Sequence, residues 1–159
     1  MVCGSRRLTQ ALGRMDQLIS IYLGKGCFLL HPSSMYDEFG PWIAHQPGLG
    51  VSGGAPDEVL GQLILLARAY SNNGTPVENP RGGVSFPLGK FAGISSWGTL
   101  NRNSPIMAQV IFSGAGTSLI KNVRDRGGYS PDMANAEQLG LVPGLSFLGS
   151  AVRRILSAA

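Results

Sequence analysis

Two pairs of short apolar runs, each pair joined by a glycine-containing turn, constrain the fold of this chain most strongly. Residues 18–23 (LISIYL) and 27–30 (CFLL) flank Gly24-Lys25-Gly26, and residues 106–112 (IMAQVIF) and 118–120 (SLI) flank the five residues 113–117. Short runs rich in β-branched and aromatic residues on both sides of a glycine turn are typical of antiparallel hairpins. The sequence therefore predicts a mostly antiparallel central sheet built from hairpins.

Apolar residues at helical spacing predict helices that pack on this sheet, at about residues 56–71, 88–101 and 145–157. The first is the best marked, because Pro56 suits the first helical position and Asn72-Asn73-Gly74 stops a helix. The middle one is either a single short helix or two helices joined at Ser95-Ser96. We therefore expect an α/β fold of the α+β type.

Both of the outer helices contain a Leu-Gly pair in their first turns, at Leu60-Gly61 and at Leu148-Gly149. A glycine inside a helix costs about 1 kcal/mol relative to alanine, so a repeated one predicts close packing against a strand or against the other helix. Coincidence is the alternative, since the chain has 23 glycines.

The length of 159 residues suits one domain, which we expect over residues 15–159 after a disordered N-terminal extension, residues 1–14. Met15 is an alternative natural start to Met1. No apolar run is long enough to cross a bilayer, no export signal is recognisable, and two cysteines cannot form a disulfide framework. We expect a cytoplasmic protein with no membrane contact.

Charge gives little support to nucleic-acid binding. The net charge is +4, but five of the 13 basic residues lie in residues 1–14 and at Arg153-Arg154, which leaves 8 basic against 9 acidic residues in the body of the chain. Nucleic-acid binders usually show a basic stripe with stacking aromatic residues among it. No direct contact with nucleic acid is expected, although a nucleic-acid-binding module remains an alternative.

Residues 48–53 (GLGVSG) match the G-x-G-x-x-G pattern of dinucleotide-binding loops. The context disagrees, because no buried strand precedes the glycines, and Asp57 and Glu58 place negative charge where a phosphate would lie. We expect a flexible loop that enters a helix and no bound cofactor, with a small nucleotide-binding enzyme as the alternative. Metal is not expected either, since Cys27 and His31 stand about 13 Å apart on a strand.

Two segments are predicted to be mostly loop. Residues 31–54 are interrupted by prolines, so we expect a structured loop with at most one edge strand, and residues 124–132 (RDRGGYSPD) have the composition of turns. Their charged and aromatic residues are of the types that dominate protein interfaces. A solvated turn, in which Asp125 pairs with a neighbouring arginine, is an equal alternative for the second segment.

Several short stretches occur in an order that resembles the immunity proteins of bacterial contact-dependent growth inhibition systems. The stretches are His31-Pro32-Ser33, Gly40-Pro41-Trp42, residues 55–61 (APDEVLG), residues 88–97 (LGKFAGISSW), Gly127-Gly128-Tyr129 and Phe147-Leu148-Gly149. They span residues 18–157. None is diagnostic alone, so the order and the spacing carry the resemblance.

The resemblance implies a protein without catalytic activity that binds and blocks the C-terminal toxin domain of a cell-surface effector, the toxin commonly being a nuclease. A monomer or weak dimer is expected. No binding residue transfers by motif, so residue type alone selects the candidate toxin-binding positions, which are Tyr36, Asp37, Glu38, Trp42, Arg124, Asp125, Arg126 and Tyr129. The basic net charge departs from the acidic character of many nuclease inhibitors, which argues against simple mimicry of nucleic acid.

Overall fold

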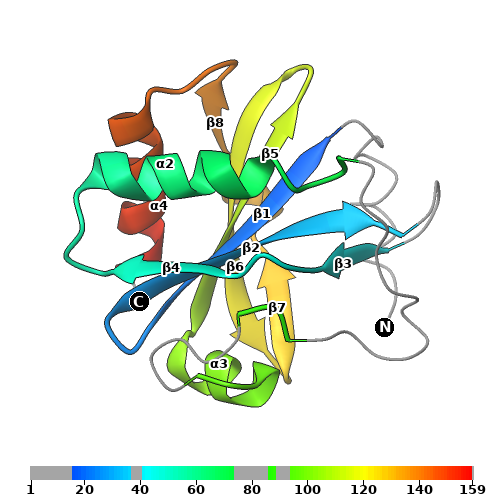
Figure 1. Cartoon of the computed structure of the whole chain (residues 1–159), viewed down its shortest axis with the longest axis vertical. Coiled ribbons are helices and arrows are strands. Elements are labelled where there is room, and N and C mark those ends of the chain that lie inside the picture. The colour runs from blue at the N-terminus through cyan, green and yellow to red at the C-terminus, as the bar shows by residue number, and fades with distance from the viewer. Residues whose placement is uncertain (1–15, 37–40, 74–85, 89–93, 159) are drawn as a thin grey trace.

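The computed structural model describes residues 16–36, 41–73, 86–88 and 94–158, which form an eight-stranded antiparallel sheet and three α-helices (Figure 1). The strands are β1 (Gln17–Gly24), β2 (Cys27–Met35), β3 (Trp42–Ala44), β4 (Leu49–Ser52), β5 (Ile106–Ser113), β6 (Gly116–Asp125), β7 (Gly128–Pro131) and β8 (Glu137–Gly140). The helices are α2 (Asp57–Arg68), α3 (Trp97–Asn103) and α4 (Leu145–Leu156), with a 3-10 turn η3 (Met133–Asn135). The predicted α+β class is confirmed.

Both predicted hairpins form and lie at the centre of the sheet. The strand order is β3-β2-β1-β5-β6-β7, with β1 paired to β2 and β5 paired to β6. At each edge a second short strand shares the outer long strand, because β4 pairs with β2 and β8 pairs with β6. Each edge of the sheet is therefore made of two short strands end to end.

The two faces of the sheet pack against different helices, because side chains alternate between faces along each strand. Side chains that pack with α2 and α4 in the main core include Ile19, Ile21, Phe28, Leu30, Val110 and Leu119. On the other face, Tyr22, Leu29 and Met107 cluster with Leu100 of α3. Figure 1 shows α2 and α4 crossing on one side, with α3 lying apart beside β7.

The second face of the sheet carries another buried cluster, formed by Leu18, Ile111 and Ile120 on the adjacent strands β1, β5 and β6. Trp42 in β3 and Ala136 before β8 pack against it from the two sides.

Helices α2 and α4 cross through the two glycines that the sequence singled out. A Cβ built on Gly61 would lie 2.8 Å from the carbonyl carbon of Leu145, and one built on Gly149 would lie 2.7 Å from the carbonyl carbon of Asp57. Contacts this short with backbone leave no room for any side chain. The predicted close approach is confirmed, and the partner of each glycine is the other helix.

The C-terminal end of α2 is tied to the sheet by polar side chains. The hydroxyl of Ser71 donates to the carbonyl of Ser33 at 2.5 Å and accepts from the backbone N–H of Leu18 at 2.9 Å. Asn72, in the left-handed conformation, accepts from the N–H of Met35 through its side-chain oxygen at 2.8 Å. These bonds satisfy buried backbone groups and hold α2 across β1 and β2.

Three sequence predictions need correction in their details. Residues 31–54 contain the second half of β2 together with β3 and β4, so half of this segment is strand. Residues 124–132 contain the end of β6 and the whole of β7, so this segment is mainly strand. Pairing with a neighbouring strand decides these short edge strands, and composition does not report it. Of the predicted helix at 88–101, residues 94–96 are not helical, α3 covers 97–103, and residues 89–93 lie outside the described part.

The predicted extension at residues 1–14 also lies outside the described ranges. Its disorder, and the division of the chain at residue 15, stay predictions.

Candidate functional site

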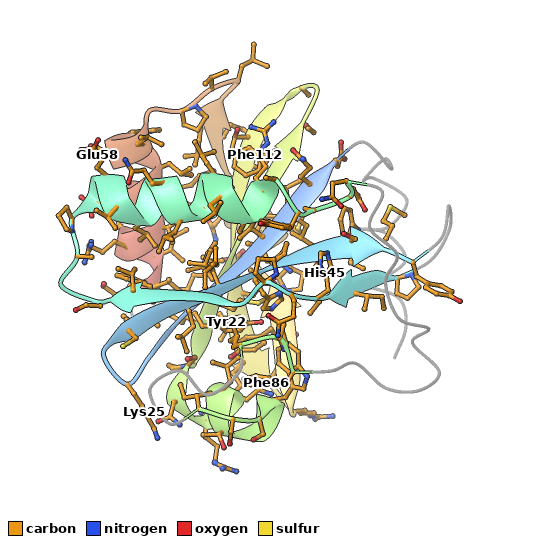
Figure 2. All side chains as sticks on the ribbon, viewed as in Figure 1. Tyr22, Lys25, His45, Glu58, Phe86 and Phe112 are labelled. Carbon is orange, nitrogen blue, oxygen red and sulfur yellow. The ribbon has the colours of Figure 1, made fainter. Side chains whose placement is uncertain are left out.

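Four exposed cations lie at the end of the sheet where α3 packs. They are Lys25 in the β1–β2 turn, Arg102 in α3, Arg124 near the end of β6 and Arg126 in the β6–β7 turn, and we call them the basic patch. Contacts join these elements: a Cβ on Gly24 would lie 2.9 Å from Ser104 Oγ, and Asn101 Nδ2 donates to the carbonyl of Gly127 at 3.2 Å. Figure 2 shows Lys25 extending beside α3.

Arg124 and Tyr129 fasten the β6–β7 hairpin to α3. Arg124 Nη1 donates to the carbonyls of Asn101 at 2.7 Å and of Arg102 at 3.3 Å, in the last turn of the helix where carbonyl groups lack helical partners. The hydroxyl of Tyr129 donates to the carbonyl of Ser104 at 2.6 Å. Burial raises the pKa of Tyr129 to about 12, so this hydroxyl keeps its proton. The hairpin is held rigidly, with its turn exposed.

Asp125 does not pair with an arginine, contrary to one prediction for this segment. Its carboxylate accepts from the hydroxyl of Ser130 at 3.5 Å, and among the described residues neither ion pair involves it. Arg126 and Gly127 both have positive φ, 44° and 84°. Two such residues make a tight hairpin turn that matches the twist of the strands, which explains why β7 can follow at once.

The other predicted interface residues lie elsewhere. Tyr36 is exposed just after β2, whereas Trp42 is half-buried in β3 and packs on the cluster of Leu18, Ile111 and Ile120. The indole N–H of Trp42 is buried and has no partner among the described residues. Asp37 and Glu38 lie outside the described residues.

The structure does not bring the two groups of predicted residues together. The strand registers place Met35 and Trp42 at one end of the sheet and Arg124 at the other, separated by about eight residues along the strands, or roughly 26 Å. They also lie on opposite sides of the central strands β1 and β5. They therefore cannot form one compact patch, whereas Arg124 and Arg126 are joined by Lys25 and Arg102, which sequence reasoning missed.

A buried histidine lies on the face of the sheet that packs against α3. His31 Nδ1 is 3.1 Å from the carbonyl of Pro32, which can only accept, so Nε2 accepts from the Tyr22 hydroxyl at 3.1 Å. The ring of Trp97 meets His31 edge-on, with 5.8 Å between ring centroids. Burial lowers the pKa of His31 to about 4 and raises that of Tyr22 well above its ordinary value. Both side chains are therefore neutral and hydrogen-bonded to each other at neutral pH.

A serine and the second histidine form a similar link near β3. Ser34 Oγ lies 2.6 Å from His45 Nε2, and His45 Nδ1 lies 2.6 Å from the carbonyl of Gln46. This is the geometry of a base that activates a nucleophile. However, Ser34 is buried and its oxygen already accepts the backbone N–H of Asn72 at 2.9 Å. The arrangement fastens β2 to β3 and to the end of α2.

The glycine-rich segment 48–53 contains β4, a strand, where a flexible loop was expected. The adjoining turn binds a cation: Arg153 of α4 donates to the carbonyl of Gly53 at 2.6 Å, to the carbonyl of Ala55, and to the carboxylate of Asp57 at 2.6 Å. A phosphate site presents N–H groups, and this turn presents carbonyl oxygens. The observed chemistry opposes the nucleotide alternative.

Metal binding and membrane insertion find no support in the part of the chain that the structure describes. No group of three or more His, Cys, Asp or Glu residues is placed there so as to hold an ion. No helix within the same ranges is long and apolar enough to cross a bilayer.

Comparison with known proteins gives likeness at the level of fold. No family model matches the sequence, and no curated protein matches it. A protein of unknown function, NMB0488 from Neisseria meningitidis, has a TM-score of 0.67 at 14% identity over 92% of this chain and 96% of its own. A chain of the CdiA-CT/CdiI toxin and immunity complex from Yersinia pseudotuberculosis has a TM-score of 0.66 at 12% identity, over 89% and 96%.

Proposed function

We propose that this chain is an immunity protein that binds and neutralises the toxin domain of a contact-dependent growth inhibition effector in the cytoplasm of the producing cell. One observation carries the proposal: its fold is similar to a chain of a toxin and immunity complex over 89% of this chain and 96% of that one. The order of short sequence stretches resembles the same class of proteins, which supports the proposal independently of the coordinates.

The scaffold has properties that suit an inhibitor. The backbones of α2 and α4 touch at Gly61 and Gly149. The side chains of its two histidines, His31 and His45, form internal hydrogen bonds. A rigid surface binds a partner at lower entropic cost than a surface that must first become ordered. Neutralisation then requires only that the bound protein covers the toxin's active site or keeps its substrate away.

The proposal predicts that a toxin domain is encoded immediately upstream of this chain, and the test is association with that domain and rescue from it. We expect the purified full chain to form a complex that survives gel filtration, and its expression to restore growth of cells that produce the toxin. Nuclease activity is the first toxin activity to assay. A toxin domain from an unrelated effector serves as the control and is expected to remain active. Failure of the cognate pair to associate would remove the proposal.

A further inference from the structure

We propose that the basic patch, Lys25, Arg102, Arg124 and Arg126, is a docking surface for a carboxylate-rich face of the protein partner. This assignment rests on the proposed function, in which that partner is the toxin domain. It adds the location of the contact and the chemistry of the face that meets it.

Among the described residues, neither ion pair involves one of the four cations of this surface. Two described carboxylates lie on or just after the β6–β7 hairpin: Asp125, which accepts from the Ser130 hydroxyl, and Asp132, which accepts from the Asn135 side chain. On the α4 side, Asp57 is paired with Arg153 and Glu137 with Arg154. Figure 2 shows Glu58 on the helical layer, far across the molecule from Lys25. The basic patch thus has a local excess of positive charge, although the body of the chain is close to neutral.

The patch is also preorganised. Arg124 is held by two carbonyls of α3, Asn101 reaches the carbonyl of Gly127, and Gly24 packs against Ser104 without space for a side chain. The three elements that carry the cations are therefore fixed relative to one another before a partner arrives. Planar guanidinium groups held in this way suit bidentate contacts with carboxylates.

Aromatic packing favours a protein partner over a nucleic acid. Proteins that bind single strands stack bases on exposed aromatic faces among their cations. Among the described residues, the aromatic rings of this end of the sheet are engaged: Trp97 packs edge-on against Phe86 and His31, and Tyr129 packs against Tyr22 and bonds to Ser104. These rings already pack against other side chains, so they do not offer the exposed faces on which bases stack.

The experiment measures binding of the full chain to the upstream toxin domain after charge reversal at Arg102→Glu, Arg126→Glu and both together. Arg124 is left intact because it caps α3. We expect each reversal to weaken binding about tenfold at low salt, mainly through slower association, and the double variant to weaken it further. The salt dependence of the association rate should fall in the same order.

The matched control is Arg154→Glu, an exposed arginine on α4, which should leave toxin binding within about twofold. Circular dichroism checks that every variant is folded. Wild-type binding that is unchanged by the double reversal overturns this assignment and leaves the proposed function standing. Absence of wild-type binding overturns the proposed function and this assignment with it.

A parallel experiment measures nucleic-acid binding. Single-stranded RNA and duplex DNA are titrated with the wild-type chain and with the double variant in the same buffer. Binding that disappears with the double reversal while toxin binding persists reassigns the patch to nucleic acid and overturns the proposal. Loss of toxin binding in the double variant supports it.

Discussion

The two sides of the sheet achieve stability in different ways. On one side, α2 and α4 touch backbone to backbone through Gly61 and Gly149. The guanidinium of Arg153 donates there to two backbone carbonyls and to the carboxylate of Asp57. On the other side, the short helix α3 lies over an aromatic and polar cluster around His31. The rim of this side carries the four cations of the basic patch, which neither ion pair of the described residues involves. The first side is held by backbone contact between two helices, whereas the second exposes positive charge that a partner can use.

This difference suggests that the two sides of the sheet have different roles. Close-packed contacts tolerate almost no added volume, so the α2–α4 layer should respond strongly to small steric changes. Exposed charge contributes little to stability, so the rim of the α3 side should tolerate substitutions that alter binding. The following predictions test that contrast, beginning with the largest expected effect.

A methyl group at the helix crossing should be the most damaging small change. Gly149→Ala places a Cβ 2.7 Å from the carbonyl carbon of Asp57, so the helices must separate, and we expect a loss of roughly 3 kcal/mol in the free energy of unfolding. Chemical denaturation of the purified chain measures it. Gly98→Ala in α3 is the matched control, because the added Cβ meets only Arg102 Nη1 at 3.9 Å.

The control should be neutral or stabilising by up to about 1 kcal/mol, since alanine favours a helix. Equal losses for both variants would contradict the contrast between the two sides.

Acid should weaken the α3 side through His31. Its pKa falls from an ordinary value of 6.5 to about 4 in the folded chain, so between these values the unfolded state binds the proton and the folded state does not. The contribution of neutral His31 to the free energy of unfolding is present in full above pH 6.5. It is lost as the pH falls toward 4, by up to roughly 3 kcal/mol. Denaturation across this range should show a shallower pH dependence for His31→Gln than for the wild type.

His45 also titrates with a lowered pKa, because burial disfavours its charged form, and it stays in place in both proteins. Its contribution to the slope is therefore common to both. Identical pH slopes for wild type and His31→Gln would show that His31 is not the group responsible.

Removing the internal cation should have a smaller effect. Arg153→Met keeps an apolar stem but leaves the carbonyls of Gly53 and Ala55 and the carboxylate of Asp57 without this donor, so we expect a loss of roughly 2 kcal/mol. Arg154→Met is the adjacent control, because its pair with Glu137 is exposed, and its expected loss is below about 0.5 kcal/mol. Thermal unfolding compares the two, and similar shifts would contradict a structural role for Arg153.

Much of the fold was predictable from local patterns. The periodicity of residues 56–71 and 145–157 predicts α2 and α4, and the two glycine turns predict the β1–β2 and β5–β6 hairpins. These elements are long or joined by tight turns, so their signals lie within a few neighbouring residues. Of the short edge strands β3, β4, β7 and β8, the sequence predicted at most one, within residues 31–54, because proline- and glycine-rich segments become strands only when a long strand lies alongside them.

The candidate site was predictable only in part. Arg124, Arg126 and Tyr129 were selected by residue type, but Lys25 and Arg102 come from a turn and a helix far away in the sequence. A count of charges along the sequence indicated a nearly neutral body. Such a count could not reveal that four cations gather at one end of the sheet. Similarly, the sequence gives no sign that Arg153 differs from the other charged residues near the ends of the chain. Its contacts with residues 53–57 show that its side chain stabilises the fold.

The sequence by itself therefore determined the central hairpins, the two long helices and the need for close approach at Gly61 and Gly149, because each depends on short-range periodicity or on the absence of a side chain. Tertiary structure alone decided which helix each glycine meets, which short segments become strands, and which cations share a surface. These depend on contacts between residues that are distant along the chain, and such contacts leave no local pattern.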